Sequence, residues 1–192
     1  MRAFIGVELA IPVVERLVVL QEELDQPIRQ LGAQARWTPA EHIRLNLKVF
    51  PNLDPGVLPR VQDMLSRFCQ ALQPFPIVSR TVRFYPELDR PRLLLVEQSD
   101  ERGVLPALRE HIEKASDPLG FARDEAPWTP DIALGRVLAG GARPDLRGLL
   151  NQWQDAEWGE TLCRELILYR TEMVGRRARV RLMRRFALGT GR

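Results

Sequence analysis

The chain has 192 residues, of which 45% are hydrophobic and 28% are charged, and its formal net charge is +3. This balance excludes an intrinsically disordered chain, and the longest apolar runs are too short to span a bilayer. The two cysteines, Cys69 and Cys163, form no metal or redox motif and are expected to be buried thiols. The first residues lack a signal-peptide core. We therefore expect one folded domain over residues 1–192, in the cytoplasm and without a membrane partner.

The spacing of apolar residues predicts the first two elements. Residues 3–9 are typical of a strand. Helical spacing then runs from Pro12 to about Leu31, with Pro12 in the first turn, where a backbone N–H is not needed. Pro27 lies inside this pattern and predicts that the helix kinks or ends near Gln26, because proline removes a helical hydrogen bond.

Residues 43–50 follow a Trp-Thr-Pro turn and alternate between apolar and polar side chains. Period-two alternation predicts a strand with one face in a core and the other exposed to water. The core face would carry Ile43, Leu45, Leu47 and Val49. The polar face would carry His42, Arg44, Asn46 and Lys48.

The same design recurs later in the chain. A second Trp-Thr-Pro, at residues 128–130, leads into an alternating strand at 131–137. After each strand the sequence predicts a helix and two strand-like runs, at 58–72, 77–85 and 92–97 and again at 144–153, 164–171 and 179–188. A further helix is predicted at 105–115. The repeat predicts an α+β fold with two lobes related by an approximate twofold axis. Each lobe would be an antiparallel sheet flanked by helices, with a central cleft between them.

Arginine dominates the basic residues, since only Lys48 and Lys114 are lysine, and a GC-rich genome explains that excess. It does not explain a run without acids at 175–185. A strand here would place Arg177, Arg179 and Arg181 on one face. Such a stripe suits phosphate groups, which guanidinium binds through paired hydrogen bonds. It equally suits a solvated edge strand whose charges block pairing with other chains.

Four stretches carry a family resemblance: residues 2–9, the set Trp37, Pro39 and 45–48, residues 130–137, and residues 165–170. Over nearly its whole length the chain resembles the two-histidine (2H) phosphoesterase superfamily of the LigT type, also called RNA 2′,3′-cyclic phosphodiesterase or 2′-5′ RNA ligase. The resemblance implies two antiparallel sheets with outer helices around a cleft. It also implies one His-x-Thr or His-x-Ser motif per sheet, with the histidines as general base and acid on a cyclic phosphate and the hydroxyls holding phosphate oxygens.

This chain departs from the motif at all four positions. The first histidine corresponds to Arg44 and its threonine to Asn46, and the second pair corresponds to Asp131 and Ala133. Arginine stays protonated in proteins, and an ordinary aspartate, with a pKa of about 4, is a poor acid near neutral pH. The usual two-histidine reaction is therefore expected to be absent, and no residue is predicted to be catalytic in the usual sense.

The chain has two histidines in other positions. His42 would share the face of Arg44, either as a lone base at the rim of the cleft or as a solvated residue at the start of the strand. His111 is expected on the surface of an amphipathic helix. The sequence contains no metal-ligand cluster, glycine-rich phosphate loop or nucleophile elbow, so neither a metal nor a cofactor is expected.

Three functions remain open. The first is an inactive relative that binds RNA ends or nucleotides through a basic cleft. The second is an active cyclic phosphodiesterase or RNA ligase that uses His42 with Asp131, and the third is a protein-interaction scaffold with an unused cleft. The ligand-binding candidates are Arg44, Asn46, Lys48 and Arg136 for phosphate, with Phe4 and Trp37 either stacking on a base or packing in the core.

The charges at the two motif positions are opposite. Across a narrow, partly desolvated cleft, Arg44 and Asp131 would attract each other, directly or through a water. The sequence therefore predicts that they pair and partly fill the phosphate site. Removing Asp131 would then strengthen anion binding at Arg44, Lys48 and Arg136.

Overall fold

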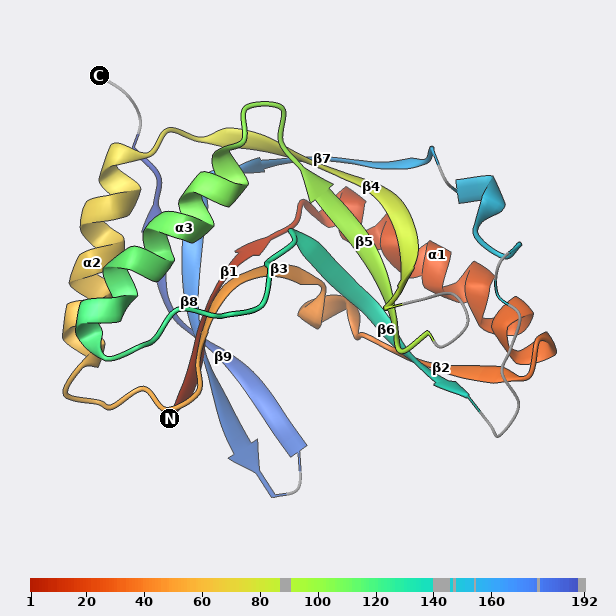
Figure 1. Ribbon diagram of the computed structural model, residues 1–192, viewed down its shortest axis with the longest axis horizontal. Coiled ribbons are helices and arrows are strands. Elements are labelled where there is room, and N and C mark those ends of the chain that lie inside the picture. The colour runs from red at the N-terminus through yellow and green to blue at the C-terminus, as the bar shows by residue number, and fades with distance from the viewer. Residues whose placement is uncertain (87–90, 140–145, 147, 154, 176, 190–192) are drawn as a thin grey trace.

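The protein is built from two antiparallel sheets, as predicted (Figure 1). The computed structural model describes residues 1–86, 91–139, 146, 148–153, 155–175 and 177–189. The first sheet, sheet A, has the strand order β3-β1-β8-β9 and consists of Arg44–Phe50, Arg2–Glu8, Glu165–Val174 and Arg177–Ala187. The second, sheet B, has the order β2-β6-β5-β4-β7 and consists of Ala33–Trp37, Asp131–Ala139, Leu93–Ser99, Phe75–Tyr85 and Glu157–Cys163.

Helices cover one face of each sheet. Helix α1 (Ile11–Gln30) lies along sheet B, whereas α2 (Leu58–Ala71) and α3 (Val104–Ser116) lie on sheet A (Figure 1). Each helix has apolar side chains at helical spacing, and burying that stripe against a sheet is what stabilises it. The stripe of α1 is Val13, Leu17, Leu20, Leu24 and Ile28. Among the described residues, no helix combines the length and the apolar character needed to cross a membrane.

The first helix does not end near Gln26, which was one of the two outcomes predicted for Pro27. Pro27 lies inside α1, which continues to Gln30, and the Pro27 carbonyl accepts a hydrogen bond from the N–H of Leu31 at 3.2 Å. Ile28, one residue beyond the proline, is completely buried. The packing of this last turn offsets the hydrogen bond that the proline removes, so tertiary contacts override the local signal.

Neither sheet is formed by one half of the sequence. β3 belongs to sheet A, yet the hairpin β4–β5 that follows it belongs to sheet B. In the same way β6 belongs to sheet B, and the later hairpin β8–β9 belongs to sheet A. The two repeats therefore exchange their hairpins, so the chain passes repeatedly from one sheet to the other.

The remaining differences concern short elements. No helix forms in the described part of the predicted segment 144–153, where Asn151–Trp153 is a single 3₁₀ turn, while residues 144, 145 and 147 lie outside the described residues. Gly148 lies in this segment and disfavours a helix. The edge strands β2 and β7 of sheet B were not predicted. β2 is only five residues long and is rich in alanine, which gives a weak alternation signal.

Candidate functional site

The first motif position lies on the face of sheet A that α2 and α3 leave free. Arg44 pairs with Glu8 of β1, and Asn46 pairs with Gly6, so both side chains project from the same face. Phe4 and Tyr169, on the neighbouring strands β1 and β8, share that face because they pair with each other. The motif pair 44 and 46 thus has the common orientation that period-two alternation predicts.

Arg44 has an unusual environment for a cation. Its side chain is only 8% exposed, and its guanidinium carbon lies 4.4 Å from the centre of the Tyr169 ring and 5.8 Å from that of Phe4. Its Nη2 donates a hydrogen bond to the backbone carbonyl of Glu41. Among the described residues no carboxylate forms an ion pair with it. Aromatic faces and one carbonyl compensate a buried charge less fully than a carboxylate does.

A carboxylate does lie close by, but it is already engaged. Glu8, the β-ladder partner of Arg44, accepts a hydrogen bond from the Tyr169 hydroxyl at 2.7 Å and forms an ion pair with Arg185 at 3.2 Å. Burial and the bond to Glu8 raise the pKa of the Tyr169 phenol well above its usual range. The phenol therefore remains a neutral donor to Glu8, and Arg44 keeps an uncompensated charge.

The second motif position is arranged in the opposite way. The side chain of Asp131 is 7% exposed, and its Oδ2 accepts bonds from Arg83 on β4 and from the hydroxyl of Thr129. Its other oxygen, Oδ1, is buried and has no hydrogen-bond partner among the described residues. The predicted pairing of Arg44 with Asp131 is therefore wrong. Sequence alternation could not reveal Arg83, because that residue comes from a different hairpin.

A β-bulge in β6 determines which other side chains accompany Asp131. Leu95 pairs with Ala133 and Leu94 pairs with Gly135, so Leu134 is an extra residue without a ladder partner. An extra residue reverses the alternation beyond it. Arg136 consequently lies on the same face as Asp131 and Ala133, the face opposite α1, and its side chain is exposed. The predicted contact of Arg136 with a phosphate stays a prediction.

A second bulge, in β3, has the reverse effect on Lys48. Ile5 pairs with Lys48 and Gly6 with Asn46, so Leu47 is the extra residue. Lys48 therefore projects from the helix-covered face and not from the face of Arg44. The prediction that Lys48 shares the phosphate-binding face is wrong, because one bulged residue moves it to the other side of the sheet.

On that other face Lys48 belongs to an ionic cluster in which Lys48, Glu113 and Arg109 are buried and Asp124 is exposed. Its Nζ lies 2.6 Å from Glu113 on α3 and 2.9 Å from the carbonyl of Ala122, with Asp124 at 3.8 Å. Arg109 pairs with both Glu113 and Asp124. Burial lowers the pKa of the Lys48 ammonium, and Asp124 opposes that shift. The cluster ties β3 to α3 and is a structural feature.

The aromatic candidates separate in a similar way. Phe4 stacks on Tyr169 with ring centres 5.0 Å apart and lies at the site. Trp37 lies on the opposite face of sheet B, where its indole N–H donates to Asp25 of α1 at 2.8 Å. Its ring packs on the backbone at Gly135, where a Cβ would lie only 2.8 Å from it. The suggestion that Trp37 stacks on a bound base is therefore wrong, and its alternative role in packing is correct.

The two histidines lie outside the motif pair. His42 ends the 3₁₀ turn Ala40–His42 that precedes β3, is half-buried, and so does not continue the alternation of the strand. His111 is exposed on α3, as predicted. Among the described residues there is no group of three or more His, Cys, Asp or Glu side chains that could hold a metal ion.

The two Trp-Thr-Pro turns hold the motif strands together crosswise. Thr38 of the first turn donates its backbone N–H to the Leu134 carbonyl at 2.8 Å and its hydroxyl to the Ala133 carbonyl at 2.7 Å. Trp128 of the second turn directs its indole N–H at the Asn46 carbonyl, 3.4 Å away. The turn that leads into β3 thus contacts β6, and the turn that leads into β6 contacts β3. These contacts hold β3 and β6 beside each other.

Comparisons with known proteins agree with this arrangement. The family model described as the 2′-5′ RNA ligase superfamily matches residues 14–173. The chain belongs to this superfamily. The RNA 2′,3′-cyclic phosphodiesterase of Methanothermobacter thermautotrophicus is 24% identical over 172 residues, which is 90% of each chain. The protein of that name from Aeropyrum pernix is 24% identical over 136 residues, covering 71% of this chain and 76% of that one.

Solved structures share the fold of this chain. The protein TT0787 of Thermus thermophilus superposes with a TM-score of 0.79 at 22% identity and covers all of both chains. E. coli LigT complexed with 3′-AMP gives a TM-score of 0.74 at 18% identity over 97% of each chain. The α+β fold predicted from the resemblance is confirmed.

Proposed function

We propose that this member of the superfamily binds the phosphate of a nucleotide or an RNA end at Arg44 and does not hydrolyse cyclic phosphates by the two-histidine mechanism. The observation that carries the proposal is the buried guanidinium of Arg44, which has no carboxylate partner among the described residues. A phosphate supplies the charge and the paired acceptors that a guanidinium binds best. Asn46 on the same face and Arg136 on β6 would add donors.

Two features argue against proton-transfer catalysis. Arg44 cannot accept a proton near neutral pH, because its guanidinium stays protonated. Oδ2 of Asp131 already accepts bonds from both Arg83 and Thr129, so this oxygen is engaged within the protein. General acid–base catalysis needs one group of each kind within reach of the reacting atoms.

The relatives support the choice of ligand class. E. coli LigT has been solved in complexes with 3′-AMP, with ATP and with phosphate, and the matched archaeal proteins are named for RNA 2′,3′-cyclic phosphates. Nucleotide phosphate is therefore the first ligand to test. The site also differs from a simple anion site, because the aromatic rings of Phe4 and Tyr169 lie directly against the Arg44 guanidinium.

The test measures binding and turnover in the same preparation. Calorimetric titration with 3′-AMP at low salt should show binding that weakens as salt is added, because the contact is ionic. Arg44→Met, which keeps the stem of the side chain and removes its charge, should weaken this binding about fiftyfold. Arg102→Met, a change at an exposed arginine in the turn before α3, is the matched control and should bind like the parent.

Incubation with adenosine 2′,3′-cyclic phosphate, followed by chromatography, measures hydrolysis. We expect no product above the uncatalysed rate. Turnover that disappears in His42→Ala or Asp131→Asn would favour the alternative enzyme, with His42 as base and Asp131 as acid. Absence of both binding and turnover would remove the nucleotide from consideration altogether.

A further inference from the structure

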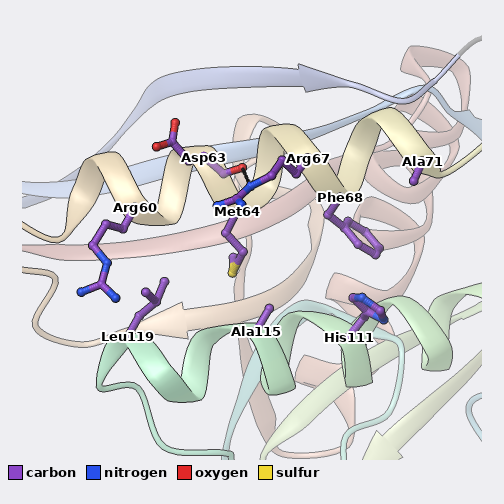
Figure 2. A pocket seen from close by; sticks show the side chains of 9 residues that line it. All are labelled: Arg60, Asp63, Met64, Arg67, Phe68, Ala71, His111, Ala115 and Leu119. Carbon is purple, nitrogen blue, oxygen red and sulfur yellow. Dashed lines mark hydrogen bonds between the residues drawn. The ribbon is translucent and has the colours of Figure 1, made fainter.

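A groove of about 520 Å³ runs between α2 and α3, on the side of sheet A that the nucleotide proposal does not use (Figure 2). Met64 and Phe68 point into it from α2, one helical turn apart (Figure 2). Ala115 and His111 point into it from α3, and Leu119 closes one end (Figure 2). Two rows of side chains at one-turn spacing, one on each helix, therefore form its walls.

The groove exists because the residues that α3 presents there are too small to fill it. Ala115 faces α2 where a leucine would complete the packing between the helices (Figure 2). The rings of Phe68 on α2 and His111 on α3 contact each other across the space between the helices, with ring centres 5.0 Å apart. Between the two helices lies a furrow whose lining is partly polar and in larger part apolar, and a third helix can pack into a furrow of this kind.

The rim of the groove carries positive charge. Arg60 and Arg67 lie two turns apart on α2, both exposed, and neither forms an ion pair with a described carboxylate. Arg67 donates to the backbone carbonyl of Asp63 on its own helix, and the Asp63 carboxylate points away from the groove (Figure 2). On α3, Glu110 is already paired with Lys114 and Arg123.

We infer that the α2–α3 groove is a docking site for an acidic amphipathic helix of a partner protein. The apolar face of the helix would lie on Met64, Phe68, Ala115 and Leu119. Its glutamates or aspartates would face Arg60 and Arg67, whose spacing of seven residues matches acids two turns apart on the bound helix. The site is separate from Arg44, so it neither requires the nucleotide proposal nor fails with it.

Two designed peptides of equal length test this directly. Both carry leucine at positions i, i+3, i+4 and i+7 of a helix, and one has glutamate at the remaining positions where the other has lysine. Fluorescence anisotropy of labelled peptide should show binding of the glutamate peptide to the intact protein and at least tenfold weaker binding of the lysine peptide.

Variants locate the binding. Ala115→Glu places a bulky acid on the groove wall and should abolish binding of the glutamate peptide. The double change Arg60→Ser with Arg67→Ser should weaken binding at least tenfold. Removing two arginines elsewhere, with Arg29→Ser on α1 and Arg102→Ser, is the matched control and should leave binding unchanged. Because both groove arginines are exposed, the double variant is informative even if Ala115→Glu fails to fold.

Three results would overturn the inference. The first is equal affinity for both peptides, or binding that neither groove variant changes. The second is concentration-dependent dimerisation that Ala115→Glu abolishes, because a second copy of the chain would then be the occupant. The third is displacement of the glutamate peptide by 3′-AMP in the Arg44→Met variant. Because Arg44 is absent there, that result would make the groove itself a nucleotide site.

Discussion

The two motif strands differ in whether the charged side chain at the motif position has an oppositely charged partner. On β3, Arg44 lies against the stacked rings of Tyr169 and Phe4 and has no acid paired with it among the described residues, whereas on β6 Asp131 is paired with Arg83. Both side chains are more than nine-tenths buried. A buried ion that already has its counter-ion has little affinity for another ligand, while one without a counter-ion gains by binding an anion. The difference points to β3 as the strand that binds ligand and β6 as the strand that supports it.

Removing the unpaired charge should have the largest effect on binding. We expect Arg44→Met to weaken 3′-AMP binding about fiftyfold, or ~2.3 kcal/mol, the scale of hydrogen bonds to a charged group. Its free energy of unfolding without ligand should change by less than about 1 kcal/mol, because no ion pair is lost. Titration calorimetry and urea unfolding measure the two quantities. A large loss of stability together with unchanged affinity for 3′-AMP would show that Arg44 has a structural role and does not bind the ligand.

Removing the paired cation should chiefly affect stability. Arg83→Met leaves the Asp131 carboxylate buried without its ion pair, and we expect a loss of about 2 kcal/mol in the free energy of unfolding. Adding Asp131→Asn to the same chain should restore most of that loss, because the uncompensated charge is gone. Urea unfolding of the parent, both single variants and the double variant measures this. Additive losses would show that the two side chains are not coupled.

Releasing Arg83 should have a smaller effect on binding. In Asp131→Asn the site loses a negative charge and Arg83 becomes available, so affinity for 3′-AMP should rise about threefold, or ~0.6 kcal/mol. The direction matches the sequence-based expectation, but the freed guanidinium is that of Arg83 and not of Arg44. Titration of Asp131→Asn in the Arg83→Met background provides the control, since the gain should shrink there. Weaker binding in Asp131→Asn would show that the carboxylate contacts the ligand.

The smallest effect concerns the ring that supports Arg44. A raised phenol pKa means that folding favours the neutral form of Tyr169, so its contribution to stability is complete below the unfolded pKa, about 10, and is lost as pH rises further. By pH 10 the parent should lose ~0.5 kcal/mol more than Tyr169→Phe, which has no proton to release. Urea unfolding of both proteins between pH 7 and 10.5 tests this. Parallel pH profiles would contradict it.

The run of alternating arginines at Arg177, Arg179 and Arg181 had two possible interpretations from the sequence, a phosphate-binding face or a charged edge strand. The ladder between β8 and β9 places Arg177, Arg179 and Arg181 at alternate positions, as predicted, and β9 is an edge strand of sheet A. Arg181 pairs with Arg170, the residue after Tyr169, so Arg179 and Arg181 lie on the face that the site does not occupy, whereas the side chain of Arg177 is not among those described. Glu172 on β8 also forms ion pairs with Arg170 and Arg181. These facts favour the edge-strand interpretation of the stripe.

The sequence by itself determined most of the strands, the three helices and the superfamily, because alternation, helical spacing and the motif stretches are local properties of the chain. It also located Arg44 and Asp131 on their strands. It could not determine their partners, since Tyr169 and Glu8 lie 125 and 36 residues from Arg44, and Arg83 lies 48 residues from Asp131.

Only the tertiary structure decided which polar side chains surround the site. Single extra residues at Leu47 and Leu134 reverse the alternation of the two motif strands, and these bulges remove Lys48 from the site face and bring Arg136 onto it. A bulge leaves no clear signal in the sequence, because it is set by how a strand pairs with its neighbour. The face on which a side chain beyond the bulge lies is therefore fixed by pairing between strands that are distant in the chain.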